Sequence, residues 1–215
     1  MSLMQRFHDG GPFMYFILAF AVLTASLVLE RVFALYIKAK PIPGAFRTQV
    51  LDFIRRGDLR GAETFTRGQA SESSLARIAE VGCHLRANAG GEEEMQSRMD
   101  ETLAAEISSL DKRTGFLAMF GNVATLLGLL GTISGMIQSF AGVASASPAD
   151  RATLLSKGIS EAMNCTAFGL IVAIPALVAY AVFQNKTDRI VTRLTEATTQ
   201  IYHDLLFLTE RSSKA

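Results

Sequence analysis

The sequence has little of what most catalytic and redox functions need. Its three histidines and two cysteines are far apart, and none lies at a spacing typical of metal ligands. It contains no glycine-rich phosphate-binding loop ending in Lys-Ser/Thr and no HExxH motif. Cys83 lies in a polar stretch and Cys165 in an apolar one, so we expect no disulfide between them. The sequence therefore predicts that the chain is not an enzyme and holds no metal or cofactor.

Charge is also scarce. Only 19% of the residues are charged, whereas 49% are hydrophobic and the mean hydropathy is +0.27. The apolar residues are concentrated in three blocks, which predicts an all-α integral membrane protein with three transmembrane helices. A net charge of +1 gives no indication of a nucleic-acid partner.

The most apolar block, Phe116–Phe140, contains 25 residues and no charge. As a helix it would be about 37 Å long, which exceeds the roughly 30 Å of a hydrocarbon core. Its small and hydroxyl residues alternate at spacings of four and three, so they share one helix face: Gly121, Thr125, Gly128, Thr132, Gly135 and Ser139. Such a face is typical of a close helix neighbour or of a polar path through the membrane.

The three blocks divide the chain into seven segments. We predict an N-terminal segment at 1–11, a first span at 12–37, a helical domain at 38–115, a second span at 116–143, a connection at 144–158, a third span at 159–183 and a C-terminal helix at 184–215. A cleaved signal peptide is the alternative for the first block. However, no convincing cleavage site follows Leu29, and apolar residues resume at Val32.

The segment 38–115 is polar, with twelve basic and twelve acidic residues. Its apolar periodicity predicts helices at 44–56, 59–67 and 74–87, with Asp58 as the N-cap of the second. Glu92–Glu94 suits the start of a further helix. Because no proline or clear stop follows, we expect this helix to continue unbroken to Val143. A second long helix should likewise continue beyond Phe183, so that both extend from the membrane into the helical domain.

Basic residues near the ends of the spans predict the orientation. Eight basic residues lie near the span ends on one side of the membrane: Lys38, Lys40, Arg47, Lys112, Arg113, Lys186, Arg189 and Arg193. The opposite side has only three, which are Arg6, Arg151 and Lys157. The N-terminus and the connection at 144–158 are therefore predicted outside, and the helical domain and the C-terminus in the cytoplasm.

Two threonines are predicted at the same depth. Thr132 lies eight residues before Phe140, about 12 Å below the outer edge, and Thr166 lies seven residues after Ile159, about 10 Å below it. The third span also has a small face, formed by Ala162, Thr166, Gly169, Ala173 and Ala176. The two faces favour antiparallel neighbours with the threonines level. Either helix packing or a polar conduit would explain them.

Glu161 is the only carboxylate within the second or third span. A carboxylate inside the membrane is a functional candidate, and the alternative is an interfacial group or a partner of Lys157. Pro175 removes one helix hydrogen bond and predicts a kink. Neither long span has a titratable side chain at mid-depth, so a proton path would need an acid from another chain.

Two motifs resemble the MotA/TolQ/ExbB proton-channel family. They are Leu126–Ile137 (LLGLLGTISGMI) in the second span and Ile159-Ser160-Glu161-Ala162, Thr166, Gly169-Leu170 and Ala173–Ala176 in the third. Glu30-Arg31 after the first span fits as well, and three spans rather than four resemble the TolQ/ExbB branch.

The resemblance implies a bacterial inner-membrane subunit of a motor driven by the proton-motive force. Such subunits form a homopentamer around a dimeric ExbD/TolR-like partner whose single span carries an aspartate. It implies an ion pathway along Thr132 and Thr166, with Glu161 at the periplasmic entrance. Helix packing is then assigned to Gly121, Gly128, Gly131, Gly135, Gly169 and Pro175. The alternative is a membrane scaffold or permease subunit that conducts no ions.

Overall fold

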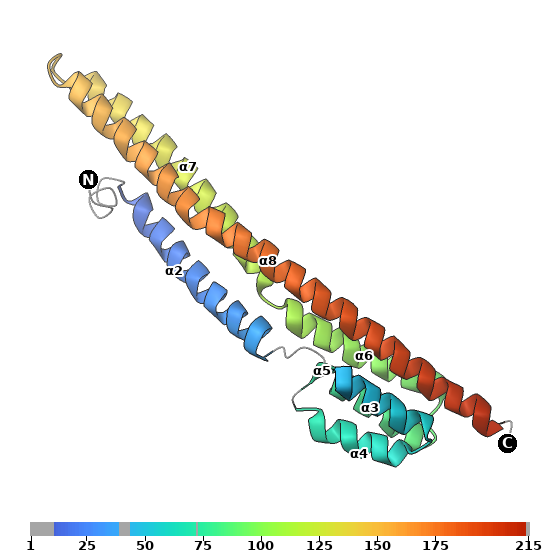
Figure 1. The fold of residues 1–215 in the computed structure, drawn as a ribbon. Coiled ribbons are helices and arrows are strands. Elements are labelled where there is room, and N and C mark those ends of the chain that lie inside the picture. The colour runs from blue at the N-terminus through green and yellow to red at the C-terminus, as the bar shows by residue number, and fades with distance from the viewer. Residues whose placement is uncertain (1–10, 39–43, 72, 214–215) are drawn as a thin grey trace. The chain divides into compact units, whose positions relative to one another are not determined.

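The computed structural model describes residues 11–38, 44–71 and 73–213, and every regular element within these ranges is a helix. The elements are α2 (Phe13–Val32), the π-helix η1 (Phe33–Lys38), α3 (Gly44–Arg55), α4 (Leu59–Gln69), α5 (Ser74–Ala87), α6 (Glu92–Asp111), α7 (Thr114–Ser145) and α8 (Arg151–Ser213) (Figure 1). Three stretches are long and apolar enough to cross a membrane, within Phe13–Tyr36, Glu92–Ser145 and Arg151–Phe207. The prediction of an all-α membrane protein is confirmed.

The helices form two compact units. The first unit comprises the chain up to Val32 together with Arg113–Phe183, and the second comprises Phe33–Lys112 together with the chain from Gln184 onward. The first unit therefore holds α2, α7 and the N-terminal part of α8. Of the predicted N-terminal segment 1–11, only Gly11 is among the described residues, and Arg6 and Lys40 lie outside them.

The second unit has its own hydrophobic core. Apolar residues at helical spacing on α3, α5, α6 and α8 are buried there, among them Val50, Ile54, Leu75, Ile78, Met95, Met99, Ile201 and Leu205. Gly82 marks the closest approach, because a methyl group built on it would lie 2.7 Å from Sδ of Met99 and 3.0 Å from Cδ1 of Leu205. The helices predicted in the segment 38–115 thus pack together and against α8.

The predicted start of α4 is confirmed in detail. Asp58 occupies the N-cap, and its Oδ1 accepts a hydrogen bond of 2.9 Å from the backbone N–H of Gly61. The starts of α5 and α6 also lie where the sequence places them, at Ser74 and Glu92.

The prediction of one unbroken helix from Glu92 to Val143 is wrong. α6 ends at Asp111 and α7 begins at Thr114, because Arg113 adopts a left-handed conformation with φ of 70°. This conformation costs a non-glycine residue about 1 kcal/mol. The Arg113 guanidinium lies 3.6 Å from the Glu30 carboxylate of α2. Neither Lys112 nor Arg113 is glycine, asparagine or proline, the residues that most strongly end a helix, so the break has no strong local signal.

The turn between α7 and α8 lies within the connection predicted at 144–158. α7 continues to Ser145 and α8 begins at Arg151, so residues 146–150 lie between the two helices. Ser147 stabilises this turn, because its Oγ donates a 2.6 Å hydrogen bond to Asp150 and its carbonyl oxygen accepts from the N–H of Arg151. α8 is then helical through Pro175 and far beyond Phe183, as expected for the second long helix.

Cys83 provides a chemical test of the core of the second unit. Its side chain is fully buried, and burial together with the nearby Glu63 charge raises the pKa of the Cys83 thiol to about 12. At pH 8.5 about half of an ordinary thiol is ionised, but only about one in three thousand Cys83 thiols would be. We expect a Cys165→Ala chain to resist maleimide at pH 8.5 while folded and to react rapidly in denaturant, as followed by mass spectrometry. Fast labelling of the folded chain would contradict the buried placement.

Candidate functional site

α7 and the first part of α8 run antiparallel and in close contact (Figure 1). A methyl group built on Gly169 would lie 2.8 Å from the carbonyl oxygen of Ala124, and one built on Gly128 would lie 3.2 Å from that of Cys165. Gly135 likewise lies against Ala162, and Gly121 against Ala173 and Leu177. Glycine permits this backbone-to-backbone approach, which maximises van der Waals contact between membrane helices.

Thr132 and Thr166 meet at this α7–α8 contact. Their hydroxyl oxygens are hydrogen-bonded to each other, and both hydroxyls also lie within hydrogen-bond distance of the carbonyl oxygen of Gly128, at 3.0 and 3.2 Å. The Ala162 carbonyl oxygen is 3.4 Å from the Thr132 hydroxyl. Both threonines are half-buried. The expected proximity of the two threonines is confirmed, and we call Thr132, Thr166 and the Gly128 carbonyl the hydroxyl cluster.

The hydroxyl cluster can exchange hydrogen bonds, but it has no group that ionises near neutral pH. A threonine hydroxyl donates one hydrogen and accepts others, so it can solvate a passing cation or pass on a proton. No aspartate, glutamate, histidine, lysine or arginine occurs in Thr114–Ser145 of α7, nor in α8 between Glu161 and Lys186. α7 and this part of α8 therefore supply polar oxygens at this level without supplying a proton carrier.

Glu161 does not join the hydroxyl cluster. It precedes Thr166 by five residues, which at about 100° per residue turns the two side chains about 140° apart around α8. The Glu161 carboxylate instead lies against Gly11, at the start of α2. The structure therefore brings two of the three predicted pathway residues together and sets the third on another side of α8.

Cys165 lies between α8 and both neighbouring helices. It is buried with Met14 and Ile17 of α2, and a methyl group on Gly131 of α7 would lie 2.6 Å from its Sγ. α2 also packs on α7, where Phe20 and Phe120 meet edge to face with 5.5 Å between ring centroids. Pro175, by contrast, is exposed. Gly131 thus lies in the contact of α2, α7 and α8, whereas the side chain of Pro175 is not covered by these helices.

Sequence reasoning missed two residues of the first unit that make close contacts. Gly158 lies against Ser139, whose hydroxyl donates to the Gly135 carbonyl oxygen at 2.9 Å. Gly158 could have been found, because it precedes Ala162 by four residues and so extends the small face of the third span. Gly11 could not, because its role depends on where α2 begins relative to α8.

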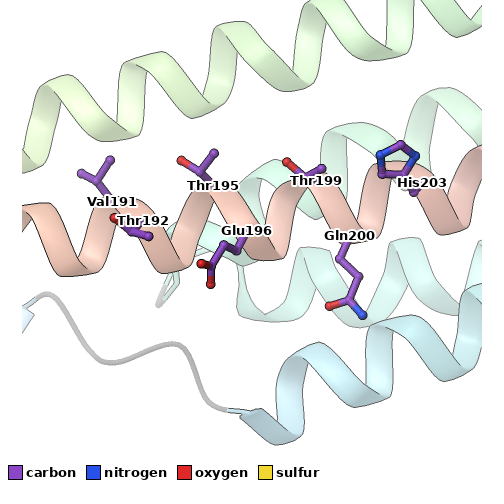
Figure 2. Close-up of a pocket in the computed structure, with 7 residues that line it drawn as sticks. All are labelled: Val191, Thr192, Thr195, Glu196, Thr199, Gln200 and His203. Carbon is purple, nitrogen blue, oxygen red and sulfur yellow. The ribbon is translucent and has the colours of Figure 1, made fainter.

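A separate open groove runs along α8 in the second unit. It has a volume of about 700 Å³ and is lined by Val191, Thr192, Thr195, Glu196, Thr199, Gln200 and His203. Figure 2 shows Thr195 and Thr199 on one side of the helix and Glu196 and Gln200 pointing to the other. The groove brings no cluster of charged groups together. Within the described residues no three His, Cys, Asp or Glu side chains could hold a metal ion.

The chain was then compared with known proteins. The profile of the MotA/TolQ/ExbB proton channel family matches residues 70–196, more than half of the chain. ExbB of Pseudomonas putida is 33% identical over 121 residues, which cover 56% of this chain and 36% of that protein. TolQ of Pseudomonas aeruginosa is 37% identical over 95 residues, which cover 44% of this chain and 41% of that protein. The matched part thus spans well under half of these relatives' length.

A solved structure extends the likeness to the fold. The structure of C. jejuni MotAB superimposes with a TM-score of 0.62 at 17% identity and covers 94% of this chain and 79% of that chain. The profile match, the ExbB and TolQ relatives and the three apolar helices together show that the chain belongs to the MotA/TolQ/ExbB proton channel family, in its TolQ/ExbB-like branch.

Proposed function

We propose that this inner-membrane motor subunit carries protons past its hydroxyl cluster and couples their flow to mechanical work on the cell envelope. The observation that carries the proposal is the direct contact of Thr132 with Thr166 around one shared carbonyl oxygen. Close packing of α7 against α8 requires only the glycines of this contact and not the threonine hydroxyls. Two hydroxyls in contact at one level add a polar step that packing does not require.

The proton carrier must come from another chain. Because α7 and the membrane part of α8 beyond Glu161 contain no titratable side chain of suitable pKa, the pathway requires an acid from outside. A single-span partner similar to ExbD or TolR, with an aspartate in its span, would supply it. We propose a homopentamer around a dimer of this partner, with the hydroxyl cluster of each subunit facing the aspartate.

Orientation follows from the basic residues. Lysines and arginines beside the inner ends of the three spans support a periplasmic N-terminus and a cytoplasmic C-terminus. In this orientation the α7–α8 turn is periplasmic, the second unit is cytoplasmic, and Glu161 lies near the periplasmic entrance. The domain boundaries proposed from the sequence place residues 12–37, 116–143 and 159–183 in the membrane.

Proton flux into vesicles tests the proposal. Vesicles would contain the chain alone, the co-expressed single-span partner alone, or both, and a pH-sensitive dye would report flux under an imposed potential. We expect flux only when both are present, because neither alone has both the acid and the hydroxyls. An assembled complex without flux would instead favour the alternative of a non-conducting scaffold or permease subunit, which the close glycine contacts also suit.

A further inference from the structure

The start of α2 is built around a glycine that touches Glu161. Gly11 has φ of +71°, and any side chain on it would overlap the Glu161 carboxylate, whose Oε1 is the nearest atom. Two independent constraints therefore favour glycine at this position. One is the left-handed backbone, which asparagine also tolerates, and the other is the space taken by the carboxylate.

The contact also brings an acidic residue to the start of α2, where the free backbone N–H groups of a helix favour acidic side chains. α2 has no acidic residue in its own first turn, and Pro12 contributes no N–H. Glu161, coming from α8, is thus the acidic residue that lies against the start of α2.

The contact belongs to a packed α2–α8 interface. Cys165 follows Glu161 by one helical turn and is buried with Met14 and Ile17. On α2, these two residues follow Gly11 by three and six positions. Glu161 therefore continues this line of α2–α8 contacts toward the start of α8.

We propose that Gly11 is a positioning residue for Glu161, and that the pair locks the beginning of α2 to α8. The inference that the pair holds α2 against α8 depends only on the contact between Gly11 and Glu161. Its effect on proton flow depends on the proposed function. With the lock intact, the carboxylate is fixed at one point beside the entrance and α2 cannot tilt away from α8. A residue with a side chain at position 11 displaces the carboxylate and releases α2.

The test combines Gly11→Asn, Glu161→Ala and both changes in one chain. Asparagine tolerates the left-handed backbone, so Gly11→Asn tests the overlap with the carboxylate rather than backbone strain. We expect Gly11→Asn and Glu161→Ala each to lower flux by at least about tenfold, since a displacement of about 1 Å can cost up to a hundredfold. The double variant should conduct as Glu161→Ala does. Gly142→Ala is the control, because no atom lies within 4 Å of the added methyl group.

Wild-type flux from Gly11→Asn, or losses that multiply in the double variant, would overturn the proposal. Unfolding temperatures of the purified chain in detergent test whether Gly11 and Glu161 are in contact, independently of proton flux. A wild-type chain that conducts no protons would contradict only the proposed function. Gly11→Asn should lower the unfolding temperature in the wild-type background and leave it unchanged beside Glu161→Ala. Equal losses in both backgrounds, or a chain that folds in neither, would show that Gly11 does not act through Glu161.

Discussion

Replacement of Thr132 or Thr166 by valine will reduce proton flux by about a hundredfold while the complex still assembles. Valine keeps the branched shape of threonine and removes only the hydroxyl. Each hydroxyl contacts the other and the Gly128 carbonyl oxygen, so one change dismantles the hydroxyl cluster. The loss of one preorganised polar group from a water-poor site costs about two to three orders of magnitude in enzyme rates, and we expect a similar scale here.

Stability should change far less than flux in these variants. A hydrogen bond between membrane helices contributes about 0.6 kcal/mol on average, because the partners left behind find other acceptors. Threonine hydroxyls on helices also commonly bond to the carbonyl one turn back, as Thr132 does to Gly128. We therefore expect unchanged yield, unchanged co-purification with the partner and an unfolding temperature within about 3 °C of wild type.

Thr125→Val is the matched control. Thr125 lies on the same helix, seven residues before Thr132, and its hydroxyl donates to the Gly121 carbonyl oxygen one turn back at 3.1 Å. It shares this local geometry but, within the described part of the chain, makes no hydrogen bond to α8. Thr132→Ser, which keeps the hydroxyl, should retain most of the flux. Normal flux in Thr132→Val, or an equal loss in Thr125→Val, would remove the hydroxyl cluster from the pathway.

Gly169→Ala will destabilise the α7–α8 pair. The added methyl group would lie 2.8 Å from the Ala124 carbonyl oxygen and 3.1 Å from Cα of Gly128, and these are backbone atoms that cannot rotate away. The two helices must therefore separate, which also pulls Thr166 from Thr132. Overpacking of this kind costs about 1–3 kcal/mol, and for a chain of this size that corresponds to roughly 3–10 °C in unfolding temperature.

Size-exclusion chromatography after stepwise heating would measure this loss, since the chain has no tryptophan for fluorescence. Gly142→Ala again serves as the control, because the same substitution there meets no atom within 4 Å. Gly169→Leu should abolish assembly altogether. A Gly169→Ala chain as stable as wild type would mean that α7 and α8 are not in backbone contact at this level.

The small faces of the second and third spans were predictable because their cause is local. Spacings of four and three fix which residues share a helix face, and a short connection fixes which residues of antiparallel helices are level. Thr132 and Thr166 follow from these two rules alone. The break at Arg113 does not, because a left-handed arginine is held by its surroundings and not by its own preference.

The placement of Glu161 depends on a third helix. Sequence shows that it is the only carboxylate of its span, but not whether it faces α7 or α2. That depends on where α2 packs, and the sequence of α2 is apolar on nearly every side, so its periodicity does not single out a contact face. The contact of Gly11 with Glu161 depends on the same packing.

The carbonyl oxygen of Gly128, which both threonines share, bears on the direction in which the hydroxyl cluster could pass a proton. Two hydroxyl hydrogens serve four possible contacts: one between the hydroxyls, one from each hydroxyl to the Gly128 carbonyl oxygen, and a longer one from Thr132 to Ala162. Thr132 can therefore donate to Thr166 while Thr166 donates to Gly128, or Thr166 can donate to Thr132 while Thr132 donates to a carbonyl oxygen. The two arrangements differ only in the rotation of hydroxyl hydrogens, and no heavy atom has to move between them. If protons pass the hydroxyl cluster as proposed, the pair can hand a proton on in either direction, and we expect the preferred direction of flow to come from the gradient and from the proposed partner.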